Sequence, residues 1–148
     1  MPDGRSVAER LADNYTRCGY RWVPLVTEGM ICDVHVLFLR PGAPGTLLQS
    51  GDIDNRIKTL LDALRMPINV DELGGYTSPL DTEDPFFVLL DDDKNIANLS
   101  VETDAMLAPL SGKETIDVND ARLTISIGVR TYDIWFDKGE GGIVPLSI

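Results

Sequence analysis

Two stretches of regular alternation constrain the fold of this chain more than any other feature. From Cys32 to Phe38 apolar residues occupy every second position, and Ala121 to Tyr132 repeats the pattern with Leu123, Ile125, Ile127 and Val129. Successive side chains of a β-strand point to opposite faces, so each stretch predicts a strand with one apolar face. The chain is therefore expected to contain a β-sheet.

Helical spacing predicts two helices. The first has the apolar positions Val7, Ala8, Leu11, Ala12, Tyr15 and Cys18, and Ser6 followed by Glu9 resembles a capping box. The second covers Asn55 to Arg65, with Asp54 as its N-cap and Pro67 at its end. Its apolar stripe consists of Ile57, Leu60, Leu61 and Leu64.

The remaining elements complete an α+β pattern. Phe86 to Leu90 predicts a short buried strand, and Asn98 to Leu107 predicts another. The order helix, strand, helix and three strands favours an α+β fold with a mixed or antiparallel sheet. A chain of 148 residues with 43% hydrophobic content fits one domain, 1–148. Residues 67–85, rich in Gly, Pro and acids, are expected to form a long acidic loop.

Charge and composition limit the function classes. The net charge of −11 repels nucleic acid at long range, and residues 66–93 contain many acids and neither Lys nor Arg. No apolar run approaches the roughly 18 residues needed to cross a bilayer, and no signal sequence is evident, so we expect a soluble cytoplasmic protein. The spacing of Cys18 and Cys32 predicts reduced thiols and neither a disulfide framework nor a zinc site.

A pair of carboxylates precedes the second helix. In an extended chain Asp52 and Asp54 point to the same side, and the N-terminus of the helix faces the same space. Carboxylates bind Mg²⁺ or Mn²⁺, while the helix N-terminus and Lys58 would favour a phosphate beside the metal. This combination suits phosphodiester cleavage.

A second acidic group follows the predicted strand at 86–90. Asp91 and Asp93 share a side if the chain stays extended there. Clustered carboxylates repel by roughly 4 kcal/mol at 4 Å and an effective dielectric of 20, and a divalent cation relieves this repulsion most directly.

Together these motifs resemble the RusA-type Holliday-junction resolvases. The matching residues are Asp52-Ile53-Asp54-Asn55, Lys58, Asp62-Ala63-Leu64, Leu90 and Asp92-Asp93-Lys94-Asn95-Ile96. The resemblance implies that Asp52, Asp54 and Asp93 bind Mg²⁺ or Mn²⁺ and that Lys58 is the essential lysine. Asp92 and Asn55 are then expected beside the metal ligands.

The resemblance also implies a RusA-like fold and a homodimer that cleaves branched DNA. The candidates for further DNA contacts are Arg56, Lys94, Arg122 and Arg130. The chain departs from the family in the inserted acidic loop at 67–85, a candidate binding surface for a protein partner, and no opening strand is evident near the N-terminus.

Several alternatives remain open at this point. Asp54 alone would fit helix capping, and Lys58 with Asp62 would fit a surface ion pair. Asp91, Asp93, Asn95 and Glu102 match four EF-hand positions, but Ile96 stands where that loop requires Gly. His35, the only histidine, fits a packing or surface role better than catalysis. A catalytically silent relative that binds proteins or mimics DNA is the main functional rival.

Overall fold

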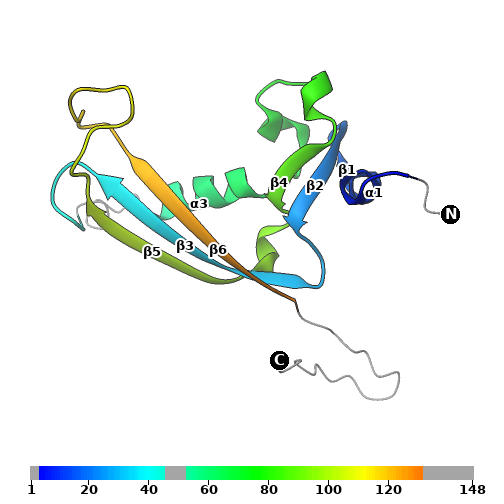
Figure 1. The fold of residues 1–148 in the computed structure, drawn as a ribbon, viewed down its shortest axis with the longest axis horizontal. Coiled ribbons are helices and arrows are strands. Elements are labelled where there is room, and N and C mark those ends of the chain that lie inside the picture. Colours follow the sequence, from blue (N-terminus) through cyan, green and yellow to red (C-terminus); the bar gives the residue numbers. More distant parts are fainter. Residues whose placement is uncertain (1–3, 46–52, 132–148) are drawn as a thin grey trace, which may run out of the picture.

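The computed structural model describes residues 4–45 and 53–131 and shows an α+β domain. Within these residues the strands form two mixed sheets of three strands each, in the orders β1-β2-β4 and β5-β3-β6 (Figure 1). In chain order the helices and strands are α1 (Val7–Asn14), β1 (Thr16–Arg17), β2 (Tyr20–Val26), β3 (Met30–Arg40), α3 (Ile53–Leu64), β4 (Phe86–Leu90), β5 (Ile96–Ala105) and β6 (Arg122–Thr131). Three short 3₁₀ helices, η1 (Val70–Leu73), η2 (Asp81–Glu83) and η3 (Asp93–Asn95), complete this set.

The two sheets are built from the same pair of chain segments. β2 and β4 run parallel in the first sheet, and after short turns their continuations β3 and β5 run parallel in the second. Strand β6 pairs antiparallel with β3, so that Val129 lies opposite Cys32 and Leu123 opposite Phe38. The apolar residues predicted from the two alternating stretches therefore share one face of the sheet.

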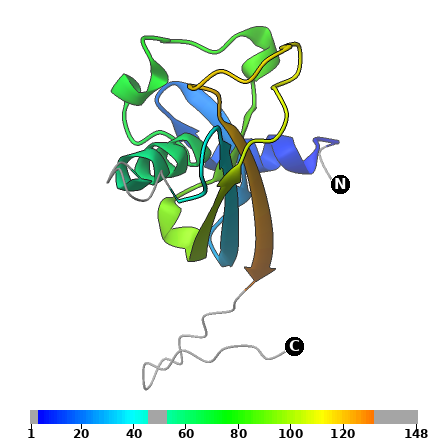
Figure 2. The ribbon, with the colours of Figure 1, turned by 90° about the vertical axis from the view of Figure 1, so that its left-hand side faces the viewer.

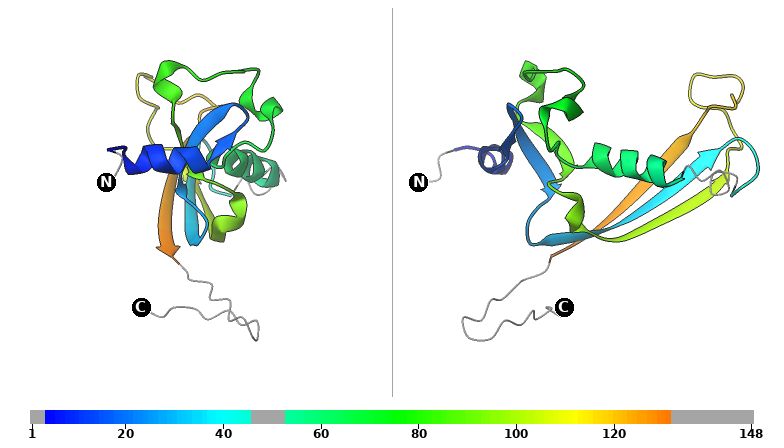
Figure 3. Two further views of the ribbon diagram at one scale, coloured as in Figure 1. Left: turned by 90° about the vertical axis from the view of Figure 1, so that its right-hand side faces the viewer. Right: turned by 180° about the vertical axis from the view of Figure 1, so that it is seen from behind.

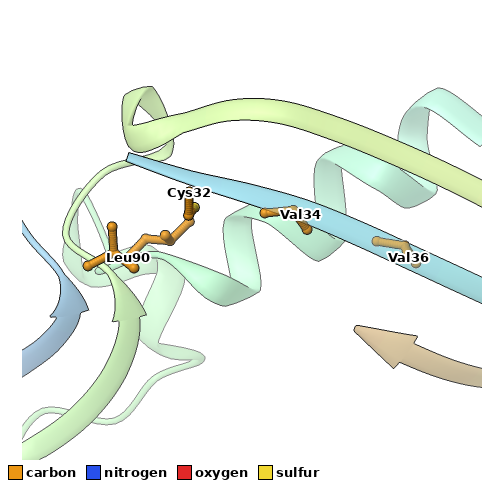
Figure 4. Close-up of a cluster of buried hydrophobic side chains, with 5 residues drawn as sticks. Cys32, Val34, Val36 and Leu90 are labelled. Carbon is orange, nitrogen blue, oxygen red and sulfur yellow. The ribbon is translucent and has the colours of Figure 1, made fainter. Parts of the chain in front are cut away.

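Helix α3 covers this apolar face. Leu60 and Leu64 pack against a buried cluster that includes Val34, Val36 and Leu90. Figure 2 shows α3 beside the sheet, and Figure 4 shows Cys32 of β3 close to Leu90 of β4, where the two sheets meet. The core thus joins both sheets and fixes α3 along β3 and β5.

The N-terminal region differs from the prediction. Ser6 caps α1 by accepting the Glu9 N–H at 3.1 Å, as expected, but the helix ends at Asn14 and does not reach Cys18. Cys18 and Gly19 have φ values of 55° and 80° and form the two-residue turn of a β1–β2 hairpin. Such turns require positive φ at both central residues, which excludes a helix there.

Strand β2 supplies the opening strand that was not expected from the sequence. Pro24 at its centre lacks an N–H and argues against a strand. It is tolerated because β1 pairs only with Tyr20 and Arg21, which leaves one side of Pro24 at an open edge. Its other side faces Val88 of β4.

The acidic segment, residues 67–85, is folded back onto the first sheet and contains η1 and η2. Arg65 donates to Glu72 at 3.1 Å, Tyr20 donates to the Ser78 carbonyl at 3.0 Å, and Arg21 donates to Asp84 at 2.8 Å. The views in Figure 3 show this segment above β2 and β4. The predicted loop is therefore packed against the first sheet through a few contacts, although most of its residues are exposed.

Two further expectations can be compared with the structure. β4 is a strand, as predicted, but Phe86 and Phe87 are exposed and only Leu90 is fully buried. Among the helices that the structure describes, none combines the length and apolar character needed to cross a bilayer.

A candidate carboxylate site between α3 and β5

An open groove of about 490 Å³ runs between α3 and β5. Its lining residues are Ile53, Asp54, Ile57, Lys58, Leu61, Asp62, Asp93, Leu99 and Val101. Asp54, Lys58 and Asp62 recur at every fourth position of α3, so they form one polar stripe along the helix. The structure therefore brings three of the predicted site residues, Asp54, Lys58 and Asp93, into one groove.

Asp54 occupies the first turn of α3. The helix begins at Ile53, so Asp54 lies inside the helix and is not its N-cap, as the sequence had suggested. A carboxylate in the first turn interacts favourably with the positive end of the helix dipole. The same N–H-rich end would also favour a phosphate bound in the groove.

Asp93 enters the groove because the chain turns into η3 directly after β4. The extended geometry in which Asp91 and Asp93 would share a side does not persist. Asp91 instead accepts a hydrogen bond from the buried amide of Asn95 at 2.5 Å. Asp92 caps η3 by accepting the Lys94 N–H at 2.9 Å, and this bond holds the pKa of Asp92 below its usual value. Asp93 is thus the acid of this triplet that lines the groove.

Lys58 does not form the surface ion pair with Asp62 that was considered as an alternative. Asp62 accepts from the guanidinium of Arg65 at 2.8 Å. Within the described residues no carboxylate lies within ion-pair distance of Lys58. Its ammonium group is therefore available to an anion in the groove.

Of the three predicted metal ligands, the structure describes Asp54 and Asp93. Asp54 and Asp93 offer carboxylate oxygens, the ligands that Mg²⁺ and Mn²⁺ prefer. Among residues 4–45 and 53–131, no group of three or more His, Cys, Asp or Glu side chains is placed to hold a metal. The third predicted ligand, Asp52, lies outside the described residues.

The other predicted residues lie around or away from this groove. Asn55 is exposed on α3 and is absent from the groove lining, and Lys94 is exposed with its amine 4.0 Å from Asp92. Arg130 pairs with Asp33 at 2.9 Å on the sheet face opposite α3, and Arg122 alternates onto that same face. Arg56 lies on α3. DNA contacts by Arg122 and Arg130 would therefore involve a different side of the molecule from the groove.

The structure also bears on the EF-hand alternative and on the role of His35. Glu102 belongs to β5 and lies 3.5 Å from His35, and strands β4 and β5 flank the acidic triplet where an EF-hand would have helices. His35 also contacts Ser100 at 2.6 Å on the face opposite α3. Its role is a surface contact between β3 and β5.

Sequence reasoning did not assign Asp62, Leu99 and Val101 to the groove. The sequence did indicate a place for Asp62 on the same helix face, because it continues the four-residue spacing of Asp54 and Lys58. Leu99 and Val101 had none, since only the pairing of β5 with β3 brings them beside α3. Comparison with known proteins gave no matching family model, curated protein or solved structure.

Proposed function

We propose that this chain is a divalent-metal-dependent endonuclease of RusA type that cleaves branched DNA such as Holliday junctions in the cytoplasm. The observation that supports the proposal most strongly is the shared groove of Asp54, Lys58 and Asp93. The neighbouring acids Asp91 and Asp92 are engaged in local hydrogen bonds, whereas Asp93 lines this groove. If Asp91, Asp92 and Asp93 formed only a solvated turn, there would be no reason for Asp93 alone to line the groove.

The proposed roles follow from the charge of each side chain. Asp54 and Asp93, with Asp52, would hold Mg²⁺ or Mn²⁺ through carboxylate oxygens. The bound ion supplies Lewis-acid polarisation of the phosphodiester. Lys58 would bind a non-bridging phosphate oxygen and stabilise the negative charge that develops during cleavage. The first turn of α3 would add its N–H groups to the same phosphate.

The proposed substrate is two-fold symmetric, and so is the proposed enzyme. A homodimer would present two such grooves to two of the four strands of a four-way junction. Because the chain carries a net charge of −11, the divalent ion also has to offset repulsion between the acids and the DNA.

A cleavage assay tests this function. A labelled four-way junction and a linear duplex of the same sequence are incubated with the protein in Mg²⁺, Mn²⁺, Ca²⁺ or EDTA. We expect cleavage of the junction in Mg²⁺ and Mn²⁺, little cleavage of the duplex, and none in EDTA. Lys58→Ala should lower turnover strongly and leave Mn²⁺ affinity nearly unchanged, because the amine contacts phosphate and not metal. Equal cleavage with and without EDTA would contradict the proposal.

A catalytically silent protein-binding or DNA-mimic module is the second candidate function. It is favoured by the acidic segment, which forms a structured acidic surface on the first sheet. Metal binding without cleavage of any branched substrate, combined with binding of a protein, would favour this candidate over the nuclease.

A further inference from the structure

An aromatic pocket lies on the first sheet, beneath the acidic segment and on different residues from the carboxylate groove. It has a volume of about 240 Å³ and is lined by Tyr20, Trp22, Leu73, Tyr76, Glu83 and Phe86. The residues come from β2, β4 and the acidic segment, so the pocket exists because that segment folds back onto the sheet.

The inner wall of the aromatic pocket is rigid. Tyr20 and Trp22 are each 5% exposed, and their ring centroids lie 5.6 Å apart. The Trp22 indole N–H donates to the Arg17 carbonyl at 3.0 Å, and Phe86 packs edge-on against Trp22 at 5.2 Å. Tyr76, at 74% exposure, stands at the mouth of the pocket. The aromatic surface that a ligand can reach therefore comes mainly from Tyr76 and from Phe86, which is 37% exposed.

The charge around the aromatic pocket is negative. Glu83 contributes a carboxylate to its wall, and residues 66–93 contain neither Lys nor Arg. Two neighbouring cations are bound by acids, since Arg65 pairs with Asp62 and Glu72, and Arg21 pairs with Glu9, Asp13 and Asp84. A third, Arg17, donates to the Pro67 carbonyl at 3.3 Å. Such a field attracts a cation and repels a nucleic acid.

A second hollow of about 190 Å³ extends the aromatic pocket towards the C-terminal end of α3. It shares Trp22, Leu73 and Phe86 with the first, and its lining adds the acids Asp62 and Glu72 together with Arg65, which pairs with both. The acidic segment also carries the exposed apolar side chains Ile68, Val70 and Leu80. Aromatic and apolar contacts within an acidic rim are typical of a surface that binds a basic peptide.

We propose that the aromatic pocket binds an arginine or lysine side chain from a basic segment of a partner protein. The cation would lie against the aromatic faces and pair with Glu83, while the flanking residues of the segment lie along the second hollow. Cation–π contacts are strong with Tyr, and Tyr76 presents an exposed ring to this pocket. An unpaired DNA base would also stack on aromatic rings, but its phosphates would meet the acidic rim.

The test uses a peptide pair that differs only in charge. The probe is a fluorescein-labelled peptide of Arg and Leu residues in a Gly-Ser background, and its partner carries citrulline, the neutral isostere of Arg. Binding to the full chain is measured by fluorescence anisotropy in EDTA, so the result does not depend on metal binding or nuclease activity. The Trp22 indole N–H resonance reports whether this pocket is occupied.

We expect the Arg peptide to bind, the citrulline peptide to bind at least about fivefold more weakly, and the Trp22 signal to shift with the Arg peptide only. Tyr76→Ala and Glu83→Gln should each weaken binding about threefold to tenfold. Both variants should fold, because Tyr76 is exposed and the Glu83→Gln side chain keeps an oxygen for the Leu80 N–H, which donates to Glu83 at 3.0 Å. Asp71→Asn, on the acidic segment but outside both hollows, is the matched control and should change affinity little.

Equal binding of the two peptides would overturn the proposal, as would unchanged affinity in both Tyr76→Ala and Glu83→Gln. Absence of binding by the Arg peptide at millimolar concentration would do the same. If a single-stranded oligonucleotide shifts the Trp22 resonance and the Arg peptide does not, the partner of this pocket is DNA and not a basic protein segment.

Discussion

The carboxylates of Asp54 and Asp93 are the residues on which the proposed metal binding depends, because both line the groove between α3 and β5. We predict that Asp54→Asn and Asp93→Asn each reduce Mg²⁺-dependent cleavage at least about a hundredfold, equivalent to about 2.7 kcal/mol of barrier. Asp93→Asn should not lower stability in EDTA, since it removes a repelling charge, whereas Asp54→Asn should lower it by no more than about 1 kcal/mol, because the carboxylate interacts favourably with the dipole of α3. Initial cleavage rates and urea unfolding check both parts.

Asp104→Asn is the matched control for these variants. Asp104 lies on β5 away from the groove, and its side-chain oxygen accepts the Ala105 N–H, a bond that Asn retains. If Asp54→Asn or Asp93→Asn cleaved DNA at the wild-type rate, the substituted residue would not be a metal ligand.

Asn95 determines where Asp93 lies, although it does not line the groove. Its buried amide donates to the Val26 carbonyl at 3.5 Å and to Asp91 at 2.5 Å, and so holds η3 against β2. We predict that Asn95→Ala lowers the free energy of unfolding by about 1–3 kcal/mol, because it leaves the Asp91 carboxylate without its amide donor. Urea denaturation measures this change.

The exposed Asn98→Ala on β5 serves as the comparison for Asn95→Ala, and its stability should stay within about 0.5 kcal/mol of wild type. Equal stabilities of the two variants would show that Asn95 does not hold η3 in place.

The acidic segment, residues 67–85, is an element with structural contacts of its own. Arg65, whose side chain is 8% exposed, donates to Glu72 on it, and Tyr20 donates to Ser78. We predict that deletion of residues 71–84 lowers the free energy of unfolding by at least about 2 kcal/mol, because charged hydrogen bonds of Arg65 and Arg21 are lost. Thermal and urea unfolding measure the effect.

Asp71→Asn with Asp81→Asn removes charge from the acidic segment without removing the contacts of Glu72, Ser78 and Asp84. This pair of substitutions should leave stability nearly unchanged. If the deletion is as stable as the double variant, the segment is a loosely attached loop and the packed description is wrong.

The elements that could be predicted from the sequence are those whose pattern matches their burial. β3 and β6 alternate because one face packs under α3, and α3 itself shows an apolar stripe at helical spacing. The β1–β2 hairpin was missed because Tyr15 and Cys18 continue the spacing of α1 and because Pro24 disfavours a strand. The turn at Cys18-Gly19 carries no polar turn residue beside its glycine, so its signal is weak.

The candidate site could be predicted only in part. Asp54 and Lys58 are close in sequence, so their common helix face follows from spacing alone. Asp93 was selected by resemblance, but the different orientations of Asp91 and Asp93 depend on η3 and on the Asn95 side chain. The Asn95 amide also donates to the carbonyl of Val26, which is 69 residues away, and local patterns do not reveal such a contact.

At the scale of the whole molecule, the apolar face of β6 suits the proposed homodimer. In the described part of the chain, β6 pairs with β3 alone, and on its apolar face Leu123 and Val129 are 39% and 51% exposed. We predict that wild type sediments as a dimer at micromolar concentration and that Val129→Asp shifts it towards monomer without unfolding it. Val118 is exposed and lies outside β6, so the Val118→Asp variant should remain dimeric.

Sedimentation of the wild type as a monomer alone would contradict the dimer. A dimer that is equally strong in Val129→Asp would place the interface elsewhere on the molecule.

The net charge of −11 makes DNA binding the property that most directly tests the account. A divalent ion held by Asp54 and Asp93 would add positive charge where the phosphate has to lie, and Ca²⁺ can occupy an oxygen site while often failing to support hydrolysis. The measurement is a fluorescence-anisotropy titration of a labelled four-way junction in Ca²⁺ and in EDTA, for wild type and Asp93→Asn. We predict tight binding by wild type in Ca²⁺, at least about tenfold weaker binding in EDTA, and little response of Asp93→Asn to Ca²⁺. No junction binding by wild type while Ca²⁺ is demonstrably bound, or equal affinity in Ca²⁺ and EDTA, would contradict the proposal that this groove is a metal-dependent nuclease site.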